Sequence, residues 1–274
     1  MGKFKYLTAA ILVGIGLAAG LVGGLLGIGG GTVIVPCLVF FLNLNQHRAH
    51  GTSLAAVLMV SIAGVATYYL HGHVEWRLSG VMAVGGVAGA WLGATIAASI
   101  KSSALRRVFC AFMVLIGIRM IVGGCFGGED GAHAAEQLAE LVGTFRGILV
   151  SLGTGLVSGC VSGLLGIGGG IVSVPAMVLL LGVDQHTAQG VSLGAIIPTV
   201  ITGMLMHHSM GHVEFRVAKW VGLGAIAGGV AGASLAGGLS PCVLKLVFGG
   251  FILVTAVLLA MKKHQDLPGD SDFA

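Results

Sequence analysis

Eight long apolar runs with few charged residues dominate this sequence. They lie near residues 7–27, 52–70, 78–98, 104–124, 145–165, 191–206, 218–236 and 243–261. A helix needs about 20 apolar residues to cross the hydrocarbon core of a bilayer, and most of these runs reach that length. A membrane-spanning barrel would instead alternate apolar and polar positions, whereas these runs are apolar on every face. The chain is therefore predicted to be an all-α integral membrane protein with about eight transmembrane segments.

The composition agrees with this class and excludes others. Hydrophobic residues make up 56% of the chain and charged residues 9%, a balance that soluble globular chains of this length do not reach. The formal net charge of +4 is too small and too dispersed for a nucleic-acid-binding surface. The lipid bilayer is thus the expected partner, and no nucleic acid is expected.

The chain also contains an internal duplication. The stretch "GGLLGIGGGTVIVP" (Gly23–Pro36) returns as "SGLLGIGGGIVSVP" (Ser162–Pro175), 139 residues further on (162 minus 23), and "GHVEWR" (Gly72–Arg77) returns as "GHVEFR" (Gly211–Arg216) at the same offset. Such repeats are typical of secondary transporters. We predict a first transmembrane repeat over residues 1–125, an acidic polar linker over 126–144, a second repeat over 145–263 and a polar C-terminal tail over 264–274.

The relative orientation of the two repeats depends on the segment after the glycines. The run Thr32–Leu42 is only 11 residues long, so at about 1.5 Å per residue it reaches about half the hydrocarbon thickness. If this broken element returns to its starting face, most lysines and arginines fall on the side of the N-terminus. The positive-inside rule then favours an inverted repeat in the inner (plasma) membrane, with both termini cytoplasmic. Parallel repeats remain the alternative.

The glycine clusters themselves predict helix breaks that bind a substrate. Irregular backbone at membrane depth is tolerated only where it is buried in protein or lines a cavity. An unwound segment before a short helix presents backbone N–H groups and the positive end of a helix dipole, which suits an anion. The predicted substrate-binding glycines are Gly27, Gly29, Gly30 and Gly31 in the first repeat and Gly166, Gly168, Gly169 and Gly170 in the second. A pure hinge or packing role is the alternative.

Two other glycine-rich stretches have the spacing of helix-packing ridges. They are "GGVAGAWLG" (Gly85–Gly93) and "GAIAGGVAGASLAG" (Gly224–Gly237). Small residues four apart let two membrane helices approach closely, so these stretches are expected to pack rather than to bind.

A few polar side chains near the breaks are further candidates. Thr52, Ser53 and Ser192 lie at the start of apolar helices, where a hydroxyl can cap the helix or donate to a bound oxyanion. His47 and His186 precede the two serines by six residues and titrate near physiological pH, so they are candidate proton or anion contacts. Capping for the hydroxyls and simple solvation for the histidines remain the alternatives.

The sequence offers little for catalysis. Acidic residues are nearly absent from the apolar runs, and no HExxH motif occurs. A phosphate-binding loop needs a lysine after its last glycine, and Gly31 is followed by Thr32-Val33. His207, His208 and His212 have irregular spacing for a metal site. We therefore expect no enzyme activity, no cofactor and no metal.

The paired motifs are similar to those of one known family. "GLLGIGGGTVIVP" with "AHGTSLAAV", and their copies "GIGGGIVSVP" and "AQGVSLGAI", resemble the sulfite exporter TauE/SafE family, also called the toluene sulfonate uptake permease family, from Gly20 to about Lys263. The resemblance implies an inner-membrane carrier for small sulfur-containing anions such as sulfite or sulfonates. One departure is that Thr52 corresponds to Val191, so a site that uses Thr52 receives its hydroxyl from one half only.

Together these features predict a secondary transporter of a small anion that works by alternating access around the two glycine breaks. Coupling to protons and assembly into a homo-oligomer stay open. The alternative function is a non-catalytic membrane subunit or an assembly factor of a larger complex.

Overall fold

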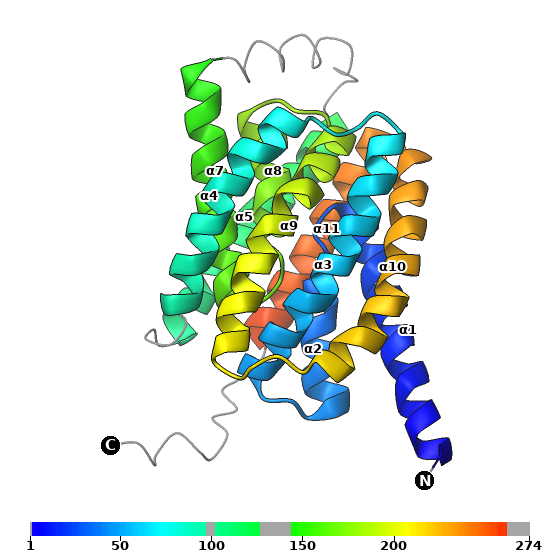
Figure 1. Ribbon diagram of the computed structural model, residues 1–274. Coiled ribbons are helices and arrows are strands. Elements are labelled where there is room, and N and C mark those ends of the chain that lie inside the picture. Colours follow the sequence, from blue (N-terminus) through cyan, green and yellow to red (C-terminus); the bar gives the residue numbers. More distant parts are fainter. Residues whose placement is uncertain (1, 97–101, 127–143, 262–274) are drawn as a thin grey trace.

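The computed structural model describes residues 2–96, 102–126 and 144–261 (Figure 1). Within these ranges the chain forms ten α-helices and no strand. The first half contains α1 (Gly2–Leu26), α2 (Gly31–Leu42), α3 (Gln46–Leu70), α4 (Trp76–Ile96) and α5 (Ser102–Phe126). The second contains α7 (Phe145–Leu165), α8 (Gly170–Leu180), α9 (Gln185–Ser209), α10 (Phe215–Gly237) and α11 (Pro241–Met261). The predicted linker 126–144, apart from its two end residues, and the predicted tail 264–274 lie outside the described residues.

Seven of the described helices are long and apolar enough to cross a membrane. They are α1, α3, α4, α7, α9, α10 and α11. Large apolar side chains cover much of the outer surface, and Phe40 and Leu70 are 79% and 82% exposed. A surface of this kind suits lipid rather than water. The predicted class of all-helical, multi-pass membrane protein is confirmed. The eighth predicted run, 104–124, lies in α5, whose described apolar part is the shorter segment Met113–Gly124.

The outer seams of the bundle join the two halves through parallel helix pairs. α1 lies along α10, and α4 lies along α7 (Figure 1). The glycine ridges form these seams, as predicted for them: a Cβ atom added at Gly89 would lie 2.0 Å from the carbonyl oxygen of Leu156, and one added at Gly228 would lie 2.2 Å from that of Leu17. Only glycine permits backbones to approach this closely.

Two antiparallel pairs occupy the rest of the bundle. In the α3–α9 pair, Gly64 faces Leu193 and Gly203 faces Leu54, so one helix ascends where the other descends. The α5–α11 pair shows the same relation, because Gly117 faces Leu253 while Gly124 faces Leu246. Figure 1 shows α2 and α8 leaving the interior toward opposite ends of the bundle.

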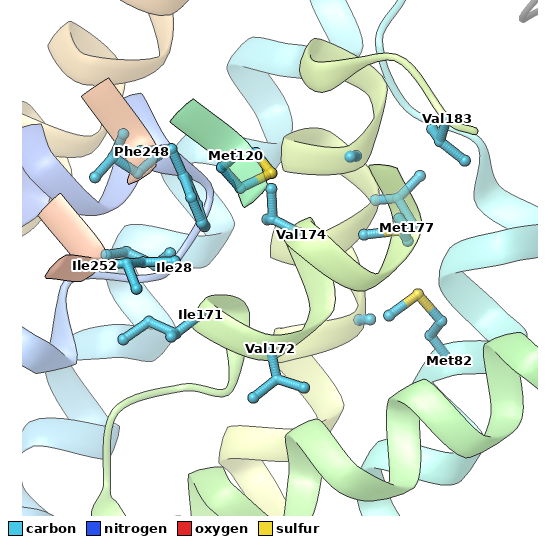
Figure 2. Close-up of a cluster of buried hydrophobic side chains, with 14 of the residues drawn as sticks. Ile28, Met82, Met120, Ile171, Val172, Val174, Met177, Val183, Phe248 and Ile252 are labelled. Carbon is cyan, nitrogen blue, oxygen red and sulfur yellow. The ribbon is translucent and has the colours of Figure 1, made fainter. Parts of the chain in front are cut away.

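A buried apolar cluster anchors α8 and the first break. Figure 2 shows Val174 of α8 near Met120 of α5 and Phe248 of α11, with Ile28 of the first break beside Ile252. All five side chains are 1% exposed or less. Side chains packed this tightly fix the position of the backbone that carries them, so both the short helix and the break are held by the surrounding spans.

Candidate functional site

The two glycine breaks lie against each other inside the bundle. A Cβ atom added at Gly31 would lie 2.7 Å from the Cα of Ile167, and one added at Gly170 would lie 2.4 Å from the Cα of Ile28. Ile28 and Ile167 belong to the two breaks, and both are buried. The first turn of each short helix therefore rests on the break of the other half, with no room for a side chain between them.

Most of the predicted glycines are needed for the turn that each break makes. Their φ values lie between 66° and 86° at Gly27, Gly29, Gly30, Gly166, Gly168 and Gly169. This left-handed conformation costs a residue with a side chain roughly 1–2 kcal/mol, and glycine reaches it freely. The other two predicted glycines, Gly31 and Gly170, begin α2 and α8 and are needed for the close approach instead.

Each short helix begins with backbone N–H groups that have no acceptor in the described part of the chain. Neither α2 nor α8 has a side-chain cap at its N-terminus. Among the described residues, no hydrogen bond uses the N–H of Gly31 or Thr32, and none uses that of Gly170 or Ile171. Free N–H groups at the positive end of a helix dipole favour an anion.

Each break accepts a hydrogen bond from one serine of the other half of the chain. The hydroxyl of Ser53 on α3 donates to the carbonyl oxygen of Gly166 at 2.5 Å. The hydroxyl of Ser192 on α9 donates to that of Gly27 at 2.9 Å and lies 2.7 Å from the hydroxyl of Ser173 on α8. The predicted serines are thus brought to the predicted glycines, in a crossed arrangement.

The hydroxyl of Thr52 is engaged elsewhere. It is buried and accepts a hydrogen bond from the backbone N–H of Glu214, in the loop before α10, at 3.0 Å. The structure brings Ser53 and Ser192 to the breaks, but it directs the Thr52 hydroxyl to the start of α10. Thr52 does not cap its own helix, because α3 begins at Gln46 with Asn45 as its N-cap.

We expect Thr52→Val to weaken the fold and to leave anion binding unchanged. Valine keeps the size of the side chain and removes the acceptor for the Glu214 N–H, at a cost of about 1–2 kcal/mol. Thermal unfolding and equilibrium anion binding of the purified variant test this. A loss of affinity as large as that of a Ser53 variant would show that Thr52 contacts the anion.

His47 and His186 lie in the first turns of α3 and α9, at opposite ends of this antiparallel pair. Each precedes its serine by six residues, which is about 9 Å along a helix axis. His47 is exposed and stacks on His212 with ring centroids 5.4 Å apart, while His186 is buried and stacks on His73 at 5.0 Å. The structure therefore places these two histidines in ring pairs at the bundle ends, away from the breaks.

Sequence reasoning missed a second polar layer beside each break. The hydroxyl of Tyr68 donates to Oε1 of Gln189 at 2.8 Å and lies 3.1 Å from the carbonyl oxygen of Gly24. In the other half, Nε2 of His207 lies 3.4 Å from the carbonyl oxygen of Gly163. Tyr68 and His207 are equivalent at the offset of 139, as are Gly24 and Gly163. The sequence signal that could have revealed this layer is a polar side chain at the same position of both repeats. It is easily overlooked, because one repeat has a tyrosine there and the other a histidine.

The interior around the breaks is polar but carries no fixed charge. Among the described residues, the buried polar side chains are hydroxyls, glutamine amides and imidazoles, and none is Asp, Glu, Lys or Arg. In the same part of the chain, no three His, Cys, Asp or Glu side chains are grouped to hold a metal ion. An anion at the breaks would be held by hydrogen-bond donors and helix dipoles.

Comparison with known proteins identifies what this chain resembles. The family model described as "Sulfite exporter TauE/SafE" matches it twice, over residues 2–149 and 150–272. A "Probable membrane transporter protein YunE" from Bacillus subtilis is 30% identical over 242 residues, which cover 84% of this chain and 89% of that protein. A "Probable membrane transporter protein" from Xylella fastidiosa is 31% identical over 264 residues, covering 94% and 98%. No solved structure matches the chain.

Proposed function

Because the chain belongs to the sulfite exporter TauE/SafE family, we propose that it is a secondary transporter of sulfite, a sulfonate or a related small sulfur-containing anion. The observation that carries this proposal is the pair of uncapped glycine breaks, Gly27–Gly31 and Gly166–Gly170, each held by a serine of the other half. The family supplies the substrate class, and the names of the relatives say membrane transporter without a substrate.

The anion is bound at the breaks by neutral donors. When the two halves separate, the hydroxyls of Ser53 and Ser192 exchange their carbonyl acceptors for oxygen atoms of the anion. The backbone N–H groups that open α2 and α8, starting at Gly31 and Gly170, complete the donor set. Hydrogen bonds to a charged acceptor are stronger than neutral ones, which offsets the loss of hydration of the anion.

Transport proceeds by alternating access between two inverted repeats. The antiparallel relation of α3 and α9, which are equivalent in the two repeats, supports this orientation. The two separate matches of the family model, 2–149 and 150–272, support the duplication. In this proposal about eight segments cross the inner membrane, both termini are cytoplasmic, and the linker at 126–144 joins the repeats on the outer side. Rocking of one half exposes the breaks first to one face and then to the other.

We expect Ser53→Ala and Ser192→Ala each to weaken binding of a labelled sulfonate to the detergent-purified protein. Each change removes one hydroxyl donor to a charged ligand, worth about 1.5–3 kcal/mol, so the dissociation constant should rise about ten- to a hundredfold. Equilibrium binding to the wild type, with sulfite and a carboxylate as competitors, provides the reference.

Ser151→Ala is the matched control, because this buried serine donates within its own helix to the carbonyl oxygen of Gly147 at 2.7 Å. Its affinity should equal that of the wild type. Unchanged affinity in both the Ser53 and Ser192 variants would mean that the anion binds elsewhere. If the wild-type protein binds no anion and purifies with a fixed protein partner, the alternative role as a subunit or assembly factor replaces the transporter.

A further inference from the structure

Three imidazoles form a line from the surface to the second glycine break. His47 on α3 is exposed, and its ring stacks on that of His212, in the loop before α10, at 5.4 Å. The ring of His212 lies 6.1 Å from that of His207 on α9, which is only 3% exposed. His207 in turn lies 3.4 Å from the carbonyl oxygen of Gly163, one turn before the break begins at Gly166. This line is called the imidazole line below.

The two inner members of the line have nitrogen atoms without a partner. Nδ1 of His207 and Nδ1 of His212 are buried, and neither has a hydrogen-bond partner among the described residues. A buried polar atom left in this way normally serves a ligand, an ion or a water molecule. An unpaired imidazole nitrogen can bind a proton near neutral pH. Burial, then His47 and Arg48, lower the pKa of His212 below its usual 6.5, so this ring is mostly neutral at pH 7.

At this end of the bundle, the charge of the imidazole line depends on which of its rings carry a proton. The other titratable or charged groups at this end include His50 and Arg48 on α3, His208 on α9, Glu214 in the loop before α10, and Arg216 and Lys219 on α10. Arg48 and Glu214 form an ion pair at 3.0 Å and largely cancel each other. From α7, the carbonyl oxygen of Gly163 faces His207.

The opposite end of the bundle carries the equivalent residues, with a buried outer histidine and a different last member. There His186 stacks on His73, and the position of His207 is taken by Tyr68, beside the carbonyl oxygen of Gly24. Both His207 and Tyr68 also pack on an equivalent glycine of the crossing helix, Gly51 and Gly190. A phenol has an ordinary pKa of about 10 and an imidazole one of about 6.5. Of these two residues, only the imidazole ordinarily exchanges a proton near neutral pH.

We propose that His207, reached through His212 and His47, is the proton-binding site that couples anion movement to proton movement, and that this coupling acts at one end of the bundle only. The proposal rests on the proposed transport function. A proton on His207 gives the site beside Gly166 a positive charge when the anion arrives. Anion and proton then cross together as a neutral pair, which costs less in a low-dielectric interior than a lone charge.

The test measures proton and anion movement in the same liposomes. The purified protein is reconstituted with a pH-sensitive dye inside, and a labelled sulfonate is added outside at the same pH on both sides and without an imposed potential, so that the sulfonate gradient alone drives the neutral pair. A sulfonate is the anion of a strong acid and stays ionised, so any acidification of the lumen reports protons carried by the protein. The wild type should acidify the lumen in proportion to sulfonate uptake.

His207→Tyr installs the residue that the other half carries at this position. Its sulfonate uptake should be slower but measurable. This uptake should acidify the lumen no more than is seen in protein-free liposomes. His208→Tyr is the control, because the neighbouring His208 is exposed and packs edge-on against Phe215 at 5.1 Å; it should behave as the wild type. His212→Asn, in the loop, provides a second variant and should reduce the acidification per sulfonate.

The outcomes separate this proposal from the transport function. Wild-type uptake without acidification, or a His207→Tyr variant that acidifies the lumen as much per sulfonate as the wild type, would overturn the proton site and leave the transporter standing. If His207→Tyr does not yield folded protein, unchanged coupling in His212→Asn would overturn it instead. Absence of sulfonate uptake by the wild type would contradict the transport function itself.

Discussion

Valine at Gly30 or at Gly169 should abolish anion transport, because neither break can form with a side chain on the glycine just before its short helix. Both residues have φ values of 78° and immediately precede a short helix. A β-branched residue in this conformation is strained by roughly 1–2 kcal/mol or more. The added Cβ atom would also lie 2.3 Å from the carbonyl oxygen of Ala19, or 2.5 Å from that of Ser158, so the short helix must move.

We expect both variants still to insert in the membrane, since the apolar spans are unchanged. Uptake of labelled sulfonate into proteoliposomes should fall to the level of protein-free liposomes. Two pairs of controls isolate the cause. Gly72→Val and Gly211→Val introduce the same left-handed strain, with φ values of 77° and 72°, where nothing lies within 4 Å. Gly14→Ala and Gly153→Ala add a Cβ atom in open space at equivalent positions of α1 and α7.

All four control variants should transport as the wild type does. If Gly30→Val and Gly169→Val also transport normally, the breaks serve packing alone and the anion passes elsewhere. The pure hinge or packing role would then be the correct reading of the glycine clusters.

Leucine at Gly89 or at Gly228 should instead prevent stable folding. These glycines lie in the α4–α7 and α1–α10 seams, where an added Cβ atom would lie 2.0 Å or 2.2 Å from a backbone carbonyl oxygen of the facing helix. The parallel pair must separate along its length, and the loss of free energy of unfolding should exceed about 3 kcal/mol, beyond the usual range for overpacking.

The measurements for this second prediction are the yield of monodisperse protein in detergent and its unfolding temperature. Gly80→Leu is the matched control, because it lies on α4 with nothing within 4 Å of an added Cβ atom. It should keep the wild-type yield and unfolding temperature. A Gly89→Leu variant as stable as the control would mean that the seams tolerate wider spacing than the structure indicates.

Local sequence signals were sufficient to predict the positions of the breaks. Helix α1 ends at Leu26 and α2 begins at Gly31, so the interruption falls on the glycines that the sequence marked. Glycine runs before a short apolar segment determine backbone geometry within a few residues, and such information is present in the sequence itself. The duplication then predicted the second break, between Leu165 and Gly170, from the first.

The sequence could not predict which residues form hydrogen bonds across the bundle. The hydrogen bond from Ser53 to Gly166 joins residues of different halves, and nothing local indicates that α3 crosses the second break rather than the first. The same crossing of helices brings Thr52 to the backbone N–H of Glu214. Sequence alone had placed Thr52 among the substrate contacts. The roles of Tyr68 and His207 also depend on which helix faces them.

The measurement that tests the central claim most directly is uptake by the purified wild-type protein in liposomes. Labelled sulfite, thiosulfate, sulfoacetate and a carboxylate are offered in turn under an imposed membrane potential, with protein-free liposomes as the baseline. The account predicts saturable uptake of at least one sulfur-containing anion, stronger than that of the carboxylate and lost in Gly30→Val. No uptake of any of these anions above the baseline, from folded protein, would contradict it.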